Sequence, residues 1–226
     1  MKILGIETSS KVCAVALSEN DKLIKEKILE DENTHSVKLM PLVDELLKET
    51  KTELKDIDLF SCDKGPGSFT GIRIGIATVK AFLDATNKKA VGVSSLEILA
   101  YNSTNDGIIC SIIDARNNNV YCGFFERKDN IIKQIGELKF DTIKNVLEEL
   151  KKMKSKITFI GDASKSYKEQ IVETMGKQAI FETEVANKLN ARNINSISYI
   201  KRDEAVDTNK LLPDYLRKSN AERQKK

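Results

Sequence analysis

Hydrophobic and polar positions follow two different periods along the chain, and these periods predict its secondary structure. Short apolar runs, typical of buried strands, are interspersed with longer stretches in which apolar residues recur every three or four positions, as in amphipathic helices. The predicted strands of the first half are 2–7, 12–18, 22–30, 58–65 and 90–95, and its predicted helices are 37–47 and a long segment from about Ser68. Tight turns are predicted between the first three strands.

The same order of elements then begins again. Predicted strands are 107–114, 119–127, 131–140, 158–162 and 178–184, and predicted helices are 141–154, with Asp141 as its cap, and 164–175. One or two further helices are expected from about residue 186 to Pro213. The repeated order predicts an internally duplicated α/β fold. We expect an N-terminal subdomain over residues 1–104, a C-terminal subdomain over 105–212 and a basic tail over 213–226.

The composition is that of an ordinary folded protein. Hydrophobic residues make up 40% of the 226 positions and charged residues 31%, with only 3 prolines, which argues against disorder. The 4 cysteines are scattered in apolar segments without a Cys-x-x-Cys pair, so we expect reduced core thiols and a cytoplasmic protein. No run approaches the roughly 18 apolar residues of a membrane helix, and we expect no membrane contact.

The positive charge is concentrated at the C-terminus. The whole chain carries +3, and its last ten residues contain five basic residues and one acidic residue. The rest of the chain is therefore close to neutral, and it shows no basic stripe with interleaved aromatic residues. This pattern disfavours direct, sequence-specific binding of nucleic acid by this chain alone.

Candidate residues for catalysis are few. His35 is the only histidine, so every Ser-His-Asp or Cys-His arrangement would depend on it, and a surface or capping role is the simpler expectation. Glu7, Thr8 and Ser9 follow the first strand, and Asp114 follows the first strand of the second half. In a phosphotransferase of a duplicated α/β fold, carboxylates at these two places would hold Mg²⁺, and the turns would contact phosphates.

Two features weaken the phosphotransferase hypothesis. The turn at residues 116–119 is Arg-Asn-Asn-Asn, which suits a tight hairpin but lacks glycine, and residues 161–164 lack the second glycine that lets a nucleotide base approach the backbone. A stand-alone small-molecule phosphotransferase or ATPase remains the alternative function. A purely structural pairing of Asp114 with Arg116 is equally compatible with the sequence.

The long helix from Ser68 carries apolar residues around most of its circumference. One stripe contains Ile72, Ile76, Val79 and Leu83, and a neighbouring stripe contains Gly71, Gly75, Thr78 and Phe82. Glycine costs a helix about 1 kcal/mol relative to alanine, so two of them one turn apart indicate the close approach of another helix. Either a neighbouring helix of the same chain covers both stripes, or this helix and the helix over 37–47 form a patch that a partner closes. In that first helix, Thr34 or Ser36 is the candidate cap, and Pro41 predicts either a bend or a late start.

Four motifs together resemble the TsaB family, also called YeaZ. They are ILGIETSS, GPGSFTGIRIG, IDARNNNVYCG and PDYLRK, and the Gly-Pro-Gly-Ser-Phe-Thr-Gly-x-Arg-x-Gly run is the most specific of them. The resemblance implies a duplicated actin-like, ribonuclease H-like fold. It also implies a non-catalytic partner of TsaD, the enzyme that transfers a threonylcarbamoyl group to the adenosine next to the anticodon of certain transfer RNAs. TsaD-like enzymes hold a metal with a His-x-x-x-His pair, whereas Leu39 stands four residues after His35 here.

The resemblance also implies partners and a contact surface. The expected partners are a TsaD-like enzyme and a TsaE-like ATPase, with a homodimer through the same surface when the chain is alone and contact with tRNA only through the enzyme. No cofactor is expected on the chain itself, although ATP or ADP at a shared interface remains open, with Glu7, Thr8, Ser9 and Asp114 as candidate phosphate contacts. The implied partner surface lies on the helix pair and consists of Val37, Met40, Val43, Leu47, Gly71, Ile72, Gly75, Ile76 and Val79.

Overall fold

The computed structural model describes residues 1–30 and 35–216, which form two units of the predicted kind. In the first unit a five-stranded sheet has the order β3-β2-β1-β4-β5, and in the second unit the order is β10-β9-β6-β7-β8. Reading the second sheet from β8 gives the same arrangement, with three antiparallel strands followed by two parallel ones. The predicted duplicated actin-like α/β fold is confirmed.

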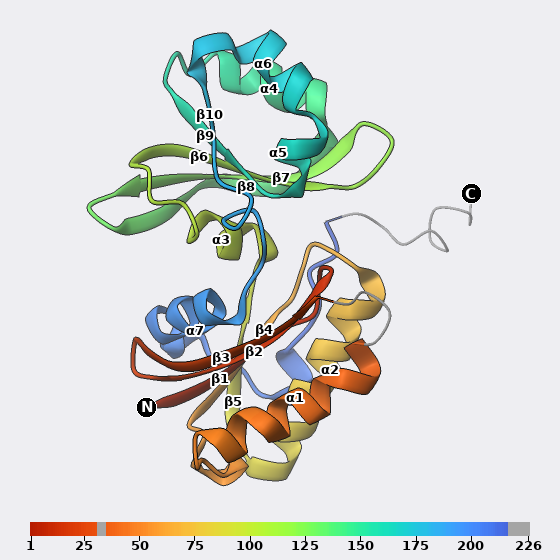
Figure 1. Ribbon diagram of the computed structural model, residues 1–226, viewed down its shortest axis with the longest axis vertical. Helices are drawn as coiled ribbons and strands as arrows, with labels where there is room; N and C mark the ends of the chain where they lie inside the picture. Colours follow the sequence, from red (N-terminus) through yellow and green to blue (C-terminus); the bar gives the residue numbers. More distant parts are fainter. Residues whose placement is uncertain (31–34, 217–226) are drawn as a thin grey trace. The chain divides into compact units, whose positions relative to one another are not determined.

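The first unit begins with three antiparallel strands, and two helices cover one face of its sheet. Its strands are β1 (Lys2–Glu7), β2 (Val12–Glu19), β3 (Lys22–Glu30), β4 (Leu59–Asp63) and β5 (Lys89–Val93). α1 (His35–Glu49) and α2 (Phe69–Thr86) lie side by side on one face (Figure 1), and α3 (Ser95–Ala100) follows β5. The core of this unit lies between the α1–α2 pair and the sheet, because the apolar stripes of both helices face it.

The second unit repeats this plan. Its strands are β6 (Gly107–Asp114), β7 (Asn119–Lys128), β8 (Ile131–Thr142), β9 (Ile157–Ile160) and β10 (Ala179–Phe181). α4 (Ile143–Lys151), α5 (Asp162–Ser166) and α6 (Lys168–Met175) follow the third and fourth strands. The core lies under α4 and α6. The predicted single helix over 164–175 is thus two helices, which meet at Tyr167.

The C-terminal boundary of the predicted second subdomain was wrong, because residues 189–214 belong to the first unit. α7 (Ala191–Ile200) packs on the face of the first sheet opposite α1 and α2. The Asn195 side chain donates from Nδ2 to the carbonyl oxygens of Ile3 (3.1 Å) and Ala16 (3.0 Å). Gly5 leaves room for this, since a Cβ there would overlap Asn195 Oδ1. Two short 3₁₀ turns, Arg202–Glu204 and Thr208–Lys210, follow α7 in place of a longer helix.

Two helix starts also differ from the prediction. The cap of α4 is Thr142, whose Oγ1 accepts from the Asn145 amide at 3.2 Å, because β8 continues through Asp141. α1 begins at His35 with Pro41 inside it, so the late start was wrong. Of its two candidate caps, Thr34 lies outside the described residues and Ser36 lies within the helix. His35 is only 6% exposed, so a surface role for it was also wrong.

Candidate functional site

The turn after β1, predicted as a phosphate contact, is buried against α2. Glu7, Thr8 and Ser9 are each 2% exposed or less. Thr8 Oγ1 donates to the Gly71 carbonyl oxygen at 2.8 Å, and the Ser68 amide donates to the Ser9 carbonyl oxygen at 2.7 Å. The beginning of α2 therefore occupies the space above the turn where a phosphate would lie in the phosphotransferase hypothesis.

The two glycines of α2 allow this approach. A Cβ on Gly71 would overlap the carbonyl oxygen of Thr8, and a Cβ on Gly75 would lie 2.5 Å from Thr8 Oγ1. The sequence correctly indicated a close approach at these positions. The neighbouring element is the β1–β2 turn of the same chain, however, and not another helix. Gly71 and Gly75 are therefore removed from the predicted partner surface.

A buried network of two carboxyl groups and two serines joins this turn to the Gly-Pro-Gly loop. Ser9 Oγ lies 2.9 Å from Glu7 Oε1 and 2.8 Å from Asp63 Oδ2. Asp63 Oδ1 accepts from the Gly65 amide at 2.6 Å and from Ser95 Oγ at 2.7 Å. Asp63 thus holds the first residue of the loop, and through it the start of α2, in register with the turn.

Asp63 was not predicted as a site residue, although the sequence contains a signal for it. Ile6 of β1 pairs with Cys62 of β4 in parallel, so Glu7 and Asp63 leave the sheet at the same edge. The carboxyl ends of adjacent parallel strands bring such side chains together. Glu7 ends one predicted strand and Asp63 lies near the end of another, so taking these strands as parallel neighbours predicts that the two carboxyl groups meet.

The Glu7–Asp63 pair binds a proton more readily than isolated carboxyl groups do. A serine hydroxyl has one hydrogen, so Ser9 Oγ can donate to only one of the two carboxyl groups at a time. Glu7 Oε2 is buried and meets no donor among the described residues. Burial, followed by the negative charge of Asp63, raises the pKa of Glu7 well above its usual range. Glu7 is therefore the carboxyl group of the pair that we expect to bind a proton first as pH falls.

Asp114, the fourth candidate phosphate contact, lies in the second unit in a different setting. Its Oδ1 accepts from the Arg116 amide at 2.8 Å and from the Tyr167 hydroxyl at 3.2 Å. Its own amide donates to Asp162 Oδ1 at 2.9 Å. The three residues after Ala115 all have left-handed φ angles, namely Arg116 (64°), Asn117 (54°) and Asn118 (60°). Asp114 therefore stabilises a tight turn. This agrees with the expectation that Asp114 and Arg116 form a structural pair.

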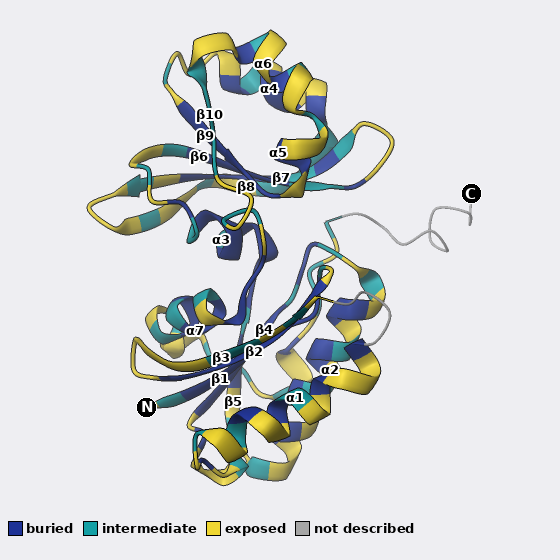
Figure 2. Cartoon of the chain, in the orientation of Figure 1, coloured by how far each residue is buried: buried dark blue, intermediate teal, exposed yellow. Residues whose placement is uncertain are grey.

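The predicted partner surface divides into inward and outward residues, and Figure 2 shows buried and exposed stretches on both helices. Val43, Ile72, Ile76 and Val79 are at most 5% exposed and belong to the core of the first unit, so the prediction that they contact a partner was wrong. The wheel placed Ile72, Ile76 and Val79 on one stripe correctly, and the chain itself covers that stripe. Val37 and Met40 of α1 are 68% and 50% exposed, and Leu47 is half-buried.

The outward face of α2 was missed. It is made by Arg73, Ala77 and Ala81, which are exposed, with Ile74 half-buried beside them. These positions lie opposite Ile72, Ile76 and Val79 on a helical wheel, so the wheel contained the signal. Ala77 and Ala81 were not predicted as contact residues, because they carry neither a charge nor a large apolar side chain.

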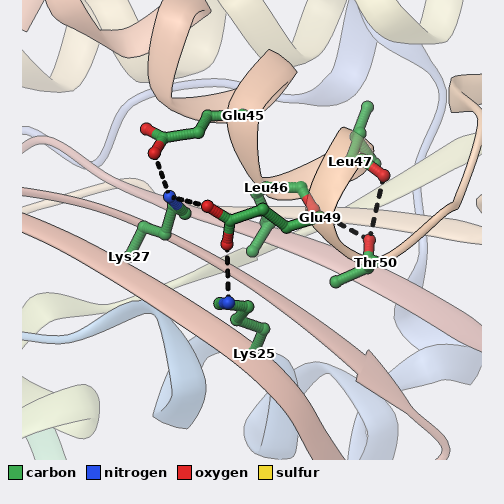
Figure 3. A network of polar contacts seen from close by, with 7 residues as sticks. All are labelled: Lys25, Lys27, Glu45, Leu46, Leu47, Glu49 and Thr50. Carbon is green, nitrogen blue, oxygen red and sulfur yellow. Dashed lines mark hydrogen bonds and ion pairs between the residues drawn. The ribbon is translucent and has the colours of Figure 1, made fainter.

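Ion pairs join α1 to the edge strand β3 (Figure 3). Lys27 Nζ lies 2.5 Å from Glu45 and 2.7 Å from Glu49, and Lys25 Nζ lies 2.6 Å from the other oxygen of Glu49. Hydrogen bonds from these two lysines lower the pKa of Glu49 to about 2. The network ties the C-terminal half of α1 to β3, while the buried Leu39, Val43 and Leu46 determine which side of the helix faces the sheet.

The described residues offer no metal-binding cluster, no membrane-spanning helix and no exposed cysteine. They contain no group of three or more His, Cys, Asp and Glu side chains placed to hold a metal ion. No described helix is both long enough and apolar enough to cross a bilayer. All four cysteines are buried free thiols, as expected, and burial raises the pKa of Cys13 to about 11.

Known proteins share this sequence and fold. The family model described as "TsaD: tRNA N6-adenosine threonylcarbamoyltransferase" matches residues 22–225. The "tRNA threonylcarbamoyladenosine biosynthesis protein TsaB" of Bacillus subtilis (strain 168) is 34% identical over 98% of this chain and 96% of its own length. The Escherichia coli (strain K12) protein of the same name is 32% identical over 58% of this chain and 57% of its own length.

Solved structures agree with the sequence comparisons. "YeaZ from Pseudomonas aeruginosa" matches with a TM-score of 0.77 and 25% identity, covering 95% of this chain and 99% of that one. A ROK hexokinase from Thermus thermophilus shares the fold alone, with a TM-score of 0.51 and 8% identity over 90% of this chain and 100% of that one. With this fold and these relatives, the chain belongs to the TsaB (YeaZ) family of tRNA threonylcarbamoyladenosine biosynthesis proteins.

Proposed function

We propose that this chain is a non-catalytic accessory subunit in the biosynthesis of threonylcarbamoyladenosine in tRNA. It binds a TsaD-like enzyme through the outward face of α1 and α2, and a TsaE-like ATPase joins the assembly. Without the enzyme, two copies pair through the same face. Recognition of the target adenosine and the transfer chemistry belong to the enzyme, and any ATP or ADP binds at an interface shared with a partner.

The observation that carries this proposal is the exposed apolar face of α1. Val37 and Met40 lie one turn apart on the same side of the helix, with 68% and 50% of their surfaces exposed. The exposed side of the adjacent α2 offers Ala77 and Ala81, whose small side chains allow a partner helix to approach closely. An apolar face next to a flat strip of small residues is suited to helix packing between proteins.

The β1–β2 turn supports the accessory role over the phosphotransferase alternative. A phosphate-binding turn needs free backbone amides and ionised carboxylates for Mg²⁺. Here the Ser9 amide donates to Glu7 Oε1 at 2.8 Å, and burial together with the charge of Asp63 raises the pKa of Glu7, which disfavours an ionised carboxylate pair. The residues that would serve a nucleotide are used to position α2, the helix that we propose a partner contacts.

The test is complex formation, measured by size-exclusion chromatography with light scattering on the chain alone and mixed with its cognate TsaD-like protein. Met40→Asp and Ala77→Arg should each abolish the mixed complex and leave the melting temperature within a few degrees, because both side chains are exposed. Val172→Asp is the matched control. Val172 is 48% exposed on α6 in the second unit, and its substitution should leave the complex intact.

Ile76→Asp is unsuitable as a probe, because Ile76 is core and its substitution would unfold the first unit. A mixed complex that survives both outward substitutions would contradict the proposed surface. Failure of wild-type chain to form any complex would contradict the accessory role itself. ATP-dependent activity of the isolated chain that is lost on replacing Thr8 and Asp114 by alanine would favour the phosphotransferase.

A further inference from the structure

A cluster of exposed lysines lies at one end of the second unit, far in sequence from the helix pair. Four of the six residues from 151 to 156 are lysines, and none is acidic. They occupy the last residue of α4 and the connection to β9. All four lysine side chains are exposed. A run of lysines at the end of one helix is common on protein surfaces. What distinguishes this run is a further lysine that the fold places beside it.

The fold adds a fifth lysine from a distant part of the chain. β10 pairs with β9 in parallel, with Ala179 opposite Ile157, and Gln178 Nε2 donates to the Ser155 carbonyl oxygen at 3.1 Å. This brings Lys177 beside the loop. We define the lysine cluster as Lys151, Lys152, Lys154, Lys156 and Lys177.

The positive charge of the cluster is not neutralised within the described part of the chain. No lysine of the cluster forms an ion pair or a side-chain hydrogen bond with a described residue. The two acidic residues of the preceding helical turn are engaged elsewhere, Glu148 with Lys144 and Glu149 with Lys139. The α4 dipole favours cations within the last turn of the helix, which accounts for Lys151 and Lys152 but not for Lys156 or Lys177.

One lysine of the cluster also occupies an unfavourable backbone conformation. Lys154 has a φ of 52°, in the left-handed region where helices commonly place glycine as they end. A lysine at this position gives up local stability and extends the cluster between Lys152 and Lys156. Repulsion among the like charges adds to this cost, and a polyanion would relieve it.

We propose that the lysine cluster contacts the phosphate backbone of tRNA in the assembled complex. This rests on the proposed function and differs from the expectation, implied by the family resemblance, that the chain contacts tRNA only through the enzyme. Lysines are mobile point charges that suit phosphates without fixed geometry, and the described residues of this loop include no aromatic side chain on which a base could stack. The contact is therefore electrostatic and independent of RNA sequence.

Salt dependence tests this contact directly. Fluorescence anisotropy of a labelled, unmodified tRNA transcript is titrated with the complex of this chain and the TsaD-like enzyme, at salt concentrations from about 50 to 200 mM. The test variant combines Lys152→Gln, Lys154→Gly and Lys156→Gln. Loss of three phosphate contacts should lower the slope of log K against log salt by about 2 to 3 and weaken binding about tenfold or more at 0.1 M salt.

A matched control removes the same charge from the first unit. Lys51 also follows a helix in the left-handed region, with a φ of 51°, and Lys22 and Lys89 are exposed. The variant Lys51→Gly with Lys22→Gln and Lys89→Gln should keep the wild-type slope. Glycine suits both left-handed positions, so neither variant should lose melting temperature through them.

The outcomes separate this proposal from the proposed function. An unchanged slope and affinity in the Lys152, Lys154, Lys156 variant, or an equal loss in the control, would overturn the phosphate contact. Both variants should still form the complex with the TsaD-like enzyme, as measured by size-exclusion chromatography. This result is expected whether or not the lysine cluster contacts phosphate. If no complex forms, the same titrations on the chain alone still decide the point.

Discussion

The two turns that follow the first strand of each unit occupy the same place in a duplicated fold, yet they are built differently. The β1–β2 turn is buried, and α2 lies directly on it through Gly71. The β6–β7 turn exposes Arg116, Asn117 and Asn118 to solvent in left-handed conformations. Duplication has preserved the backbone plan while the contacts of the turn diverged.

The carboxyl groups beside these turns diverged with them. Glu7 and Asp63 meet through Ser9 in a fully buried site. In the second unit, Asp162 accepts the Asp114 amide, and burial raises the pKa of Asp162. One pair fixes a loop that leads into a helix of the proposed partner surface, and the other fixes the hairpin itself. Similar placement in a duplicated fold therefore does not imply similar use.

The largest predicted effect comes from Gly71→Ala. In an ordinary helix this change stabilises by about 1 kcal/mol, but here the added Cβ overlaps the Thr8 carbonyl oxygen, so we expect a net loss of about 3 kcal/mol. Urea unfolding monitored by circular dichroism measures it. Ala77→Gly on the outward face of the same helix is the control and should lose only about 1 kcal/mol. A stabilised Gly71→Ala variant would show that α2 does not press on the turn.

The next effect is the pH dependence of Glu7→Gln. The folded-state pKa of Glu7 is raised above its unfolded value near 4.5, so the stability that comes from its bound proton is complete below pH 4.5 and is lost as pH rises through the folded pKa. Glutamine carries hydrogen on its amide nitrogen at every pH and keeps an acceptor oxygen. The stability of the variant relative to wild type should therefore increase steadily as pH rises above about 4.5.

Thermal unfolding from pH 4 to pH 9 measures this difference. Glu173→Gln is the control, an exposed carboxyl on α6 of the second unit, and it should follow the wild-type profile. A difference between Glu7→Gln and wild type that stays constant across the range would mean that the buried pair holds no proton. The site would then carry two negative charges, and it would again be a candidate for binding a cation such as Mg²⁺.

Much of the fold could be predicted because periodicity is a local property. The order of the strands, the start of α2 at Ser68 and the importance of Gly71 and Gly75 all follow from residues within one or two turns. What those glycines contact could not be predicted, because Thr8 lies more than sixty positions away. A helical wheel shows on which side of the helix a residue lies, but not which element packs against that side. For the same reason, nothing within 191–200 shows that α7 returns to the first sheet, where Asn195 finds the space left by Gly5.

The smallest predicted effect concerns the ion pairs that join the third strand of each sheet to the next helix. Glu49 of α1 pairs with Lys25 and Lys27 of β3, and Glu149 of α4 pairs with Lys139 of β8, so both units keep the same device. The folded-state pKa of Glu49 is lowered to about 2, so its contribution to stability is present above pH 4.5 and is lost as pH falls toward 2. Glu49→Gln should therefore narrow the stability difference between pH 6 and pH 3, measured by urea unfolding at both values. The change should be small because solvent and salt screen exposed pairs, and 0.5 M salt should shrink it further.

The same substitutions compare the two units in complex formation. Glu49 ties α1, a helix of the proposed partner surface, to β3, so Glu49→Gln should weaken the TsaD-like complex more than Glu149→Gln does. Equal effects of the two substitutions on that complex would mean that the pairs hold each helix to its own sheet without supporting the proposed partner surface.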